Sequence, residues 1–197
     1  MKKKEFKSSS KRVLDLMINS IYTNKEIFLR ELLSNASDAI DKLVFTSLTD
    51  SSVSVNRDDL KIVIERDKDA RILKISDNGI GMDEAELEHN LGTIAESGSL
   101  KFKEENKDQK DTSIIGQFGV GFYSAFMVAK KIEVISKKYN ADKAYKWTSE
   151  GADGYTIQTC DKEETGTTIV LYLNDDTDDD NYSNYLEEYT IRSIVSK

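Results

Sequence analysis

The feature that most constrains the fold of this chain is a change in the period of its apolar residues. Up to residue 45 they recur at intervals of three and four, the period of an amphipathic helix, and we expect helices over 11–21 and 25–45. Most later apolar runs are short and rich in β-branched and aromatic residues, which is typical of strands. These strands are expected at 60–64, 71–75, 132–135, 144–148, 155–159 and 167–173. Because helices precede most of the strands, the pattern favours an α+β sandwich over regular βαβ alternation.

The segments between these elements are more polar. Three further helices are expected, at 83–91, 122–129 and 185–195. The stretches 47–59 and 175–180 are expected to be loops, the second strongly acidic. The segment 92–112 is long, charged and poor in apolar residues, which is typical of a lid or another functional loop.

Length and composition limit the kind of protein. A chain of 197 residues can bury a core as a single domain, 1–197, and its one cysteine, Cys160, excludes an intramolecular disulfide. The net charge of −8 argues against general binding to a nucleic-acid backbone. The first ten residues lack the apolar core of a secretory signal, and no apolar run is long enough to span a bilayer. We therefore expect a cytoplasmic protein with no nucleic-acid or membrane partner.

The helix expected over 25–45 has two different faces. Its apolar residues form one stripe: Leu29, Leu32, Leu33, Ala36, Ile40 and Leu43. Four polar residues recur along the other side: Glu31, Asn35, Asp38 and Lys42. This polar stripe alone is most typical of a solvated helix face with an Asp38–Lys42 ion pair. A binding role is supported by Asn35, because asparagine is a poor helix former, and because a carboxylate one turn from an amide oxygen can hold a water beside Mg²⁺.

A second candidate site is the turn Asp77-Asn78-Gly79-Ile80-Gly81-Met82, which follows an expected strand. Asn-Gly alone is a common turn with left-handed backbone. Gly81 adds a position at which the backbone can approach a flat ligand closely. A carboxylate at the end of a strand can accept a hydrogen bond from an exocyclic amine, which would favour adenine over guanine.

A third candidate is the stretch Gly116-Gln117-Phe118-Gly119-Val120-Gly121, which precedes an expected helix. Free N–H groups and the positive end of a helix dipole make such a stretch a possible phosphate cradle. Its order, G-x-x-G-x-G, matches neither the dinucleotide-binding fingerprint nor the Walker A loop. Glycine-rich turns also serve packing or hinge roles, so this motif alone leaves both interpretations open.

The order of the three motifs resembles the N-terminal ATP-binding domain of the heat-shock protein 90 chaperones, particularly the bacterial members. The matching blocks are YTNKEIFLRELLSNASDAIDK at 22–42, DNGIGM at 77–82, LGTIAESG at 91–98 and IGQFGVGFYSAF at 115–126. They are long, nearly verbatim and spread over most of the chain, and 185–197 also resembles the closing helix of that domain. The resemblance implies a Bergerat-type (GHKL) fold, a two-layer α+β sandwich in which helices cover a mixed or antiparallel sheet.

The resemblance also implies roles for individual residues. Glu31 would be the general base that orients the attacking water, and Asn35 the protein ligand of Mg²⁺. Asp77 would bind the adenine amine, assisted through water by Ser34 and Thr167. ATP or ADP would be held by Asn35, Asp38, Ala39, Lys42, Asp77, Gly81, Met82, Asn90, Gly116, Gly119, Val120, Gly121, Phe122 and Thr167. Residues from about 92 to 121 would form a lid over ATP.

Two features of this chain differ from the family pattern: one residue, and the number of domains. Glu96 stands where the family usually has a lysine facing the phosphates, a charge that Lys101 or Lys103 would have to replace. The family's middle domain, which supplies an arginine to the γ-phosphate, and its dimerising C-terminal domain are expected to be absent. We expect this chain to be a monomer that binds ATP or ADP and hydrolyses ATP slowly. Client polypeptides, co-chaperones and the homodimer would belong to the full-length protein.

Two other functions fit a chain of this fold. A DNA topoisomerase or mismatch-repair ATPase is disfavoured by the acidic charge and by the LGTIAESG and GQFGVGFYSAF blocks. A binding module that does not hydrolyse ATP would make no use of Glu31 as a base. His89 has no metal-binding partner nearby and is expected on a helix surface. Cys160 is expected to have a packing role, and Trp147 is expected to pack in the sheet.

Overall fold

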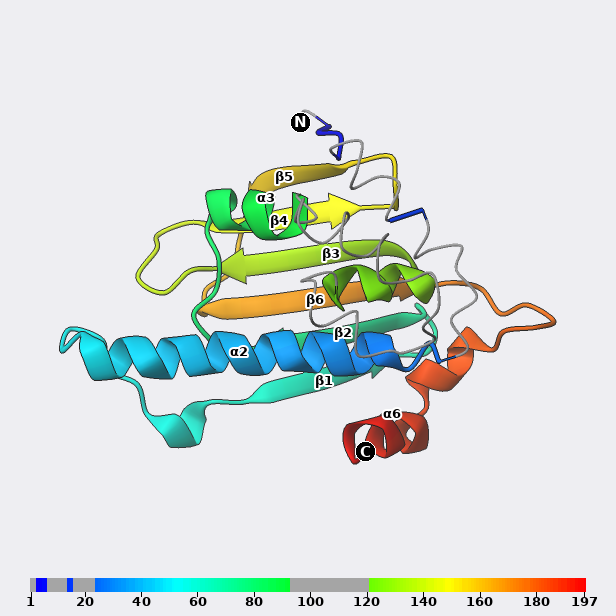
Figure 1. Ribbon diagram of the computed structural model, residues 1–197, viewed down its shortest axis with the longest axis horizontal. Helices are drawn as coiled ribbons and strands as arrows, with labels where there is room; N and C mark the ends of the chain where they lie inside the picture. The colour runs from blue at the N-terminus through cyan, green and yellow to red at the C-terminus, as the bar shows by residue number, and fades with distance from the viewer. Residues whose placement is uncertain (1–2, 7–13, 16–23, 93–120) are drawn as a thin grey trace, which may run out of the picture.

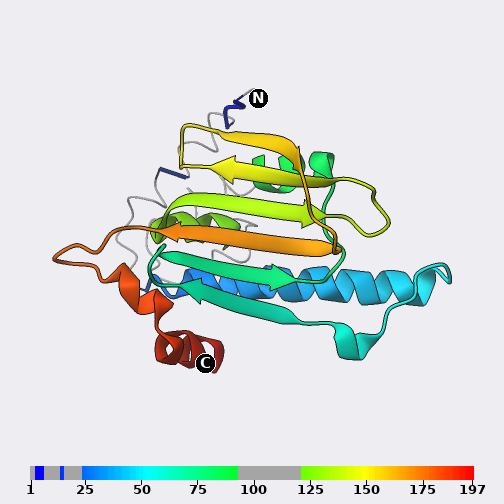
Figure 2. The ribbon, with the colours of Figure 1, turned by 180° about the vertical axis from the view of Figure 1, so that it is seen from behind.

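The computed structural model describes residues 3–6, 14–15, 24–92 and 121–197. In these residues a β-sheet carries helices on one face, so the fold is a two-layer α+β sandwich (Figure 1). In the view from behind, the strands lie in front of α2 (Ile27–Thr49) and α3 (Glu84–Gly92) (Figure 2). The expected helix-covered sheet is therefore confirmed.

The described strands form one six-stranded sheet in the order β1-β2-β6-β3-β4-β5. Their bounds are β1 Ile62–Asp67, β2 Ile72–Asp77, β3 Ala129–Lys137, β4 Ala144–Ser149, β5 Tyr155–Cys160 and β6 Gly166–Leu173. Every pair of neighbours among them is antiparallel, so the antiparallel alternative is the one found. The last strand in the sequence, β6, lies between β2 and β3 and joins the early hairpin to the later strands.

Directly paired residues form rows of side chains across β2, β6 and β3 on the face beneath the helices. Counted along the strands from the end of β2, the rows are Asp77–Thr167–Ser136, Ile75–Ile169–Val134 and Leu73–Leu171–Ile132. The second row continues on β4 to Trp147, which is fully buried as expected for a residue that packs in the sheet. Because side chains alternate between the two faces of a strand, this register places one polar row at the end of an apolar face.

Helix α2 covers this face with its apolar side. Its buried residues are Ile27, Phe28, Leu29, Leu32, Ala36 and Leu43. The helix extends four residues beyond the expected end, to Thr49, where the Thr49 hydroxyl donates to the carbonyl of Phe45 at 3.1 Å. The helix begins without a side-chain cap, and the backbone carbonyl of Asn24 lies 3.5 Å from the Ile27 nitrogen.

The apolar stretch after Val120 forms a different kind of helix from the expected one. A 3-10 helix, η2 (Gly121–Met127), replaces the helix expected over 122–129. All seven residues of η2 are buried, and β3 begins only two positions later. A buried segment this short is set by the contacts around it, which a helical period in the sequence does not record.

The closing helix is also divided. A 3-10 helix, η3 (Tyr182–Leu186), precedes α6 (Glu188–Val195), and Glu187 between them has extended backbone (φ −86°, ψ 130°). The stretch expected as a loop at 47–59 includes a further 3-10 helix, η1 (Arg57–Asp59). The helix expected at 11–21 lies almost wholly outside the described residues, and so does most of the segment 92–112.

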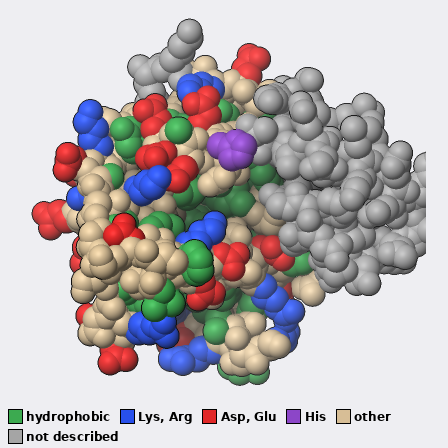
Figure 3. All heavy atoms as spheres, turned by 60° about the vertical axis from the view of Figure 1, so that its left-hand side comes forward, with side chains coloured by type: hydrophobic (Ala, Val, Ile, Leu, Met, Phe, Trp, Pro, Cys, Tyr) green, Lys and Arg blue, Asp and Glu red, His purple; other side chains and the backbone are tan. Residues whose placement is uncertain are grey.

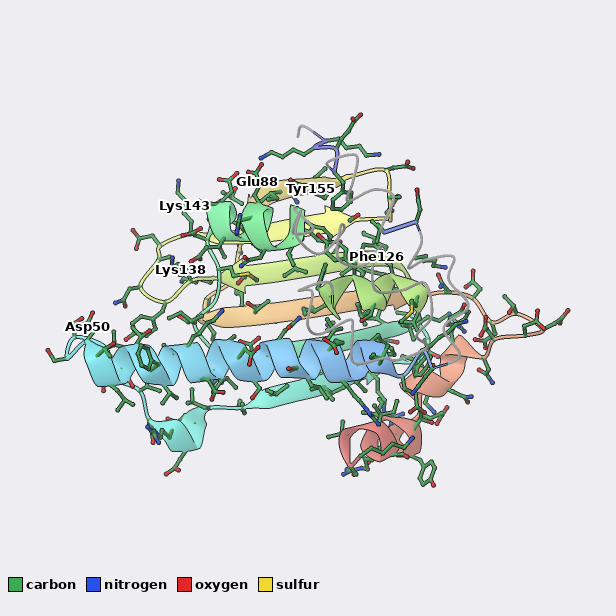
Figure 4. The ribbon with its side chains drawn as sticks, viewed as in Figure 1. Asp50, Glu88, Phe126, Lys138, Lys143 and Tyr155 are labelled. Carbon is green, nitrogen blue, oxygen red and sulfur yellow. The ribbon has the colours of Figure 1, made fainter. Side chains whose placement is uncertain are left out.

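Helix α3 is tied to the β5 edge of the sheet. The backbone of Lys4 pairs with that of Tyr155 on β5, at 2.8 and 2.9 Å. The Lys4 ammonium also donates to Glu88 of α3 at 2.7 Å, on the side of the helix near Tyr155 (Figure 4). Gly92, at the end of α3, leaves room for the Tyr155 hydroxyl, which would lie 2.3 Å from a Cβ at that position.

Candidate functional site

A cavity of about 970 Å³ lies between α2 and the polar end of the covered sheet face. Its floor consists of Asp77 and Thr167 from the first row and of Ile75, Ile169 and Val134 from the second. This size lies within the range of about 300–1,000 Å³ that is usual for small-molecule sites. The floor combines a flat apolar surface with a polar edge, which suits a planar ligand that carries polar groups on its rim.

The polar stripe of α2 forms one wall of this cavity. Glu31, Asn35, Asp38 and Lys42 all line it. The Asp38–Lys42 ion pair that a solvated face would favour is not among the ion pairs formed within the described residues. Ala39 lines the cavity between these side chains. The helix face that the sequence left ambiguous therefore faces a cavity.

Glu31 lies at the end of the cavity where η2 begins. Its carboxyl group is half-buried, and this burial raises its pKa above the ordinary value. A Cβ at Gly121 would lie 2.2 Å from the Glu31 Oε2 atom, so a side chain at residue 121 would displace the carboxylate from this position. Gly121 therefore allows the backbone of η2 and the Glu31 carboxylate to come together at one point.

The turn after β2 is fixed at both ends by backbone hydrogen bonds. The Ile80 amide donates to the Ala39 carbonyl of α2 at 3.0 Å. The Tyr139 amide, which follows β3, donates to the Ile80 carbonyl at 2.8 Å. Gly81 has φ +67°, and a Cβ there would lie 2.0 Å from the Lys137 carbonyl oxygen. Glycine is therefore required at this position for the turn to pass between the helix and the sheet.

Asp77 is the titratable group at the centre of the floor. Burial raises its pKa from 3.8 to about 6, against the opposing effect of hydrogen bonds from the backbone amides of Gly79 and Thr167. The Gly79 amide donates to Asp77 Oδ1 at 2.8 Å. This bond orients the carboxyl group, which faces the cavity as an acceptor for a ligand donor when it is ionised.

The wall opposite α2 is partly apolar. Met82 and Asn90 line it, and the Asn90 amide lies 3.6 Å from the Met82 sulfur. Phe122 of η2 lines the cavity too and packs edge-to-face against Trp147, with ring centroids 5.5 Å apart. These side chains could cover the second face of a planar ligand that rests on the apolar row of the sheet.

The structure brings most of the expected site residues together. The cavity is lined by Glu31, Asn35, Asp38, Ala39, Lys42, Asp77, Gly81, Met82, Asn90, Gly121, Phe122 and Thr167. Four other residues singled out from the sequence lie outside the described residues: Glu96, Gly116, Gly119 and Val120. Ser34 is exposed and is not part of the described lining.

Sequence reasoning missed Ser136. Its hydroxyl is completely buried beneath the site, where it accepts from the Met82 amide at 2.8 Å and lies 2.7 Å from the Thr167 hydroxyl. The signal was present in the strand alternation, because Ser136 is in phase with the buried residues Ile132 and Val134. It was overlooked because the expected strand ended at residue 135.

The described residues contain no group of three or more His, Cys, Asp and Glu side chains that could hold a metal ion by themselves. His89 is exposed on α3 and Cys160 is half-buried at the end of β5, as expected. Asn35, one helical turn from Glu31, lines the cavity, and an amide oxygen is a ligand type that Mg²⁺ accepts together with waters and phosphates. In the part of the chain that the structure describes, no helix has the length and apolar character needed to cross a membrane.

The fold and the cavity define the class of protein. Residues 9–168 match the family model for histidine kinase-, DNA gyrase B-, and HSP90-like ATPases. This match spans most of the chain, and the chain belongs to that family. The six-stranded antiparallel sheet under α2, with the cavity between them, is thus the family's ATPase fold.

Individual proteins of known name are similar to this chain over its whole length. The chain is 59% identical to the chaperone protein HtpG of Clostridium botulinum (strain Langeland) over 197 residues, which is 100% of this chain and 32% of that protein. The same identity and coverage hold for the chaperone protein HtpG of Clostridium perfringens (strain 13). The chain therefore spans about a third of the length of the curated relatives that it matches.

Proposed function

We propose that this chain is the N-terminal ATP-binding and ATP-hydrolysing domain of a molecular chaperone. The observation that carries the proposal is the cavity floor, in which the Asp77 carboxyl and the Thr167 hydroxyl stand side by side at the end of an apolar surface. Adenine has the matching shape, because its ring is flat and apolar on both faces and its edge carries an amine. The Clostridium relatives, which are named as chaperones, support the wider role.

In the proposed complex the adenine ring rests on the second row of the floor and its amine donates to Asp77. The rest of the nucleotide then extends along α2 past Asp38 toward Asn35 and Glu31. Gly121 lies at that end, where a backbone amide could face a phosphate. Lys42 lies at the other end of the stripe, on the solvent side of the cavity.

Hydrolysis is assigned to the Glu31 end of the cavity. We propose that the Glu31 carboxylate accepts a hydrogen bond from the attacking water and holds it in line with the γ-phosphate. The burial that raises the pKa of Glu31 also strengthens its interaction with a water in the cavity. Asn35 would be the protein ligand of Mg²⁺, which would neutralise phosphate charge there.

Further parts of the proposal concern the whole protein. We propose slow turnover in this chain, because the resemblance places an arginine that contacts the γ-phosphate in a separate middle domain. Residues from about 92 to 121 are proposed as the lid over ATP. Client polypeptides, co-chaperones, a homodimer and a cytoplasmic location are proposed for the full-length protein.

Titration calorimetry with ATP, ADP and GTP, followed by a steady-state ATPase assay, tests the binding and hydrolysis. We expect ATP and ADP to bind and GTP to bind far more weakly. A longer chain with the middle domain should turn over faster than this one, and equal rates would contradict the proposed division of the catalytic groups. Loss of turnover with retained binding in Glu31→Ala would distinguish an ATPase from a module that only binds ATP.

A DNA-dependent ATPase is the second candidate, because the family model also names DNA gyrase B. The net charge of −8 argues against it. On the described part of the face seen in Figure 3, Lys and Arg side chains are interspersed with Asp and Glu. An ATPase rate that rises when duplex DNA is added would favour this second candidate over the chaperone.

A further inference from the structure

Ser136 is completely buried and does not line the cavity, but its hydroxyl contacts two residues that do. Its Oγ accepts a hydrogen bond from the backbone amide of Met82 at 2.8 Å and lies 2.7 Å from the Oγ1 of Thr167. A third neighbour, the Gly166 carbonyl oxygen, is 3.4 Å away. The hydroxyl therefore joins β3, the start of β6 and the end of the turn after β2.

These partners limit the directions in which the hydrogen bonds of Ser136 can run. A serine hydroxyl has one proton to donate, and the Met82 amide already supplies a donor to its oxygen. The Ser136 proton can then go to Thr167 Oγ1 at 2.7 Å or to the Gly166 carbonyl at 3.4 Å. The contact with Thr167 is the shorter of the two, and either hydroxyl can be its donor. When Ser136 is the donor, Thr167 is the acceptor and its own proton remains free for the cavity.

We infer that Ser136 donates to Thr167 and is thereby a positioning residue for base selection, which keeps the Thr167 hydroxyl in the orientation of a donor toward the cavity. This inference rests on the proposed function, in which the base lies beside Asp77. The floor then presents an acceptor, the Asp77 carboxylate, next to a donor, the Thr167 hydroxyl. The matching base edge has an amine next to a ring nitrogen that accepts, which is the edge of a 6-aminopurine.

The same arrangement opposes a 6-oxopurine. Such a base presents a carbonyl where adenine has its amine and a protonated N1 where adenine has an acceptor, so both groups face the wrong partner. Asp77 can oppose the carbonyl without help from Ser136. Rejection of the protonated N1, directly or through a bridging water, needs the Thr167 hydroxyl to stay a donor. Without Ser136 the Thr167 hydroxyl could rotate and accept instead.

The experiment compares ATP with inosine triphosphate, which differs from ATP only by its 6-oxo group and protonated N1. Both dissociation constants are measured by titration calorimetry for the wild-type chain and for Ser136→Ala. We expect the preference for ATP over inosine triphosphate to fall about threefold to tenfold, the effect of one neutral hydrogen bond. A decrease in affinity that is equal for both nucleotides would show a structural role only and would overturn the inference.

Ser149→Ala is the matched control. Ser149 is also a buried strand serine, and its hydroxyl accepts from the Gly151 amide at 3.2 Å and donates to the Gly154 carbonyl at 2.8 Å. It lies outside the described lining of the cavity. Its removal should therefore lower stability without changing the preference for ATP. A change in preference as large as that in Ser136→Ala would overturn the inference.

A double variant tests whether Ser136 acts through Thr167. Thr167→Val removes the hydroxyl that Ser136 orients, so adding Ser136→Ala should cause no further loss of preference. A further loss of the same size would contradict the inference. If Ser136→Ala does not fold, Ser136→Cys keeps a side chain of similar size with weaker hydrogen bonds, and the same nucleotide comparison applies. A wild-type chain that binds neither nucleotide would refute the proposed function itself, which is a different result.

Discussion

Near the two ends of the β2–β6 strand pair lie two carboxyl groups whose pKa values are shifted in opposite directions. At one end, Asp77 lies in the cavity floor, and burial raises its pKa to about 6. At the other end, Asp176 follows β6 in the acidic loop, and hydrogen bonds from Ser183 and Arg71 lower its pKa to about 2. The two groups are the same amino acid at opposite ends of one pair of strands, so their surroundings cause the difference.

The acidic loop 175–180 is held to neighbouring segments by hydrogen bonds and ion pairs. The Arg71 guanidinium, in the turn between β1 and β2, donates to Asp176 at 2.9 Å and to the Asn174 carbonyl. The Asp176 carboxylate also accepts from the Ser183 amide at 2.8 Å. Lys25 forms an ion pair with Asp180 at 2.5 Å, which links the loop to the start of α2. These carboxylates stabilise the fold, and they are already paired without a ligand or metal.

Asp77 is the opposite case. It is held by backbone amides and partly desolvated, and it faces a cavity. The rise of its pKa from 3.8 to about 6 corresponds to about 3 kcal/mol against the ionised form in the folded chain. A carboxylate that is destabilised in this way gains most from a ligand that donates to it. A carboxylate that is already paired with cations and hydroxyls of the fold, such as Asp176, has a structural role, whereas Asp77 is available to bind a ligand.

The largest expected effect concerns a third carboxylate, Glu31, at the far end of the cavity. Glu31→Ala should lower ATP turnover by about 10²–10⁴-fold, the usual contribution of a general base, because the attacking water loses its acceptor. The dissociation constant for ATP should change little. Turnover is measured by phosphate release and binding by calorimetry. Asp176→Asn is the control, and unchanged turnover in Glu31→Ala would exclude Glu31 as the base.

Asp77→Asn should lower the affinity for ATP by about tenfold to a hundredfold, because a charged acceptor of one hydrogen bond is lost. The thermal unfolding temperature at pH 7 should stay the same or rise, because the variant removes a carboxylate that burial destabilises. Calorimetry and thermal unfolding measure the two effects. A clear fall in unfolding temperature would show that Asp77 is a structural residue like Asp176, and the comparison of the two ends would fail.

The affinity for adenosine should fall about tenfold from pH 7.5 to pH 5, since only the ionised form of Asp77 accepts from the adenine amine and its pKa is about 6. Adenosine is used because the phosphates of ATP titrate in the same range. The ligand-free chain should show the opposite trend from Asp77, which destabilises the fold as pH rises from 3.8 to about 6. Asp77→Asn should bind adenosine with no step near pH 6, and a step that persists there would assign it to another group.

The smallest expected effect is in the acidic loop 175–180. Asp176→Asn should lower the unfolding temperature slightly at pH 7 and leave ATP binding unchanged. Because the pKa of Asp176 is lowered to about 2, its stabilisation is present above pH 3.8 and is lost as pH falls toward 2. Unfolding curves of both chains between pH 7 and pH 2 should therefore converge, with most of the convergence below pH 3.8. A constant difference at every pH would mean that the charge of Asp176 is irrelevant.

The sequence predicted the fold class and the polar stripe well, but it could not show which way the stripe faces. The helical period places Glu31, Asn35, Asp38 and Lys42 on one side of α2, and this follows from the sequence alone. Whether that side meets solvent or a cavity depends on the turn at 77–82, which approaches the helix backbone at Ala39. That contact joins residues about 40 positions apart, and no local pattern encodes it.

Elements with mixed local signals were predicted less well. The sequence could not reveal η2, because burial of all its residues hides any difference between an α-helix and a 3-10 helix. The break at Glu187 was missed because no glycine or proline marks it, and buried apolar residues lie on both sides, Leu186 before it and Ile191 and Ile194 after it. Ser136 was missed because the expected strand ended one residue before it, and its partner on β6 follows from the register between β3 and β6.

The packing of Trp147 against Phe122 gives this chain an optical reporter of its own. Trp147 is the single tryptophan, and its indole nitrogen is buried with no hydrogen-bond partner among the described residues. Its emission therefore comes from one apolar environment, without background from a second indole. Phe122 contacts that ring on one side and lines the cavity on the other. A ligand that moves Phe122 would change the fluorescence, so occupancy of the cavity could be followed in the unlabelled protein.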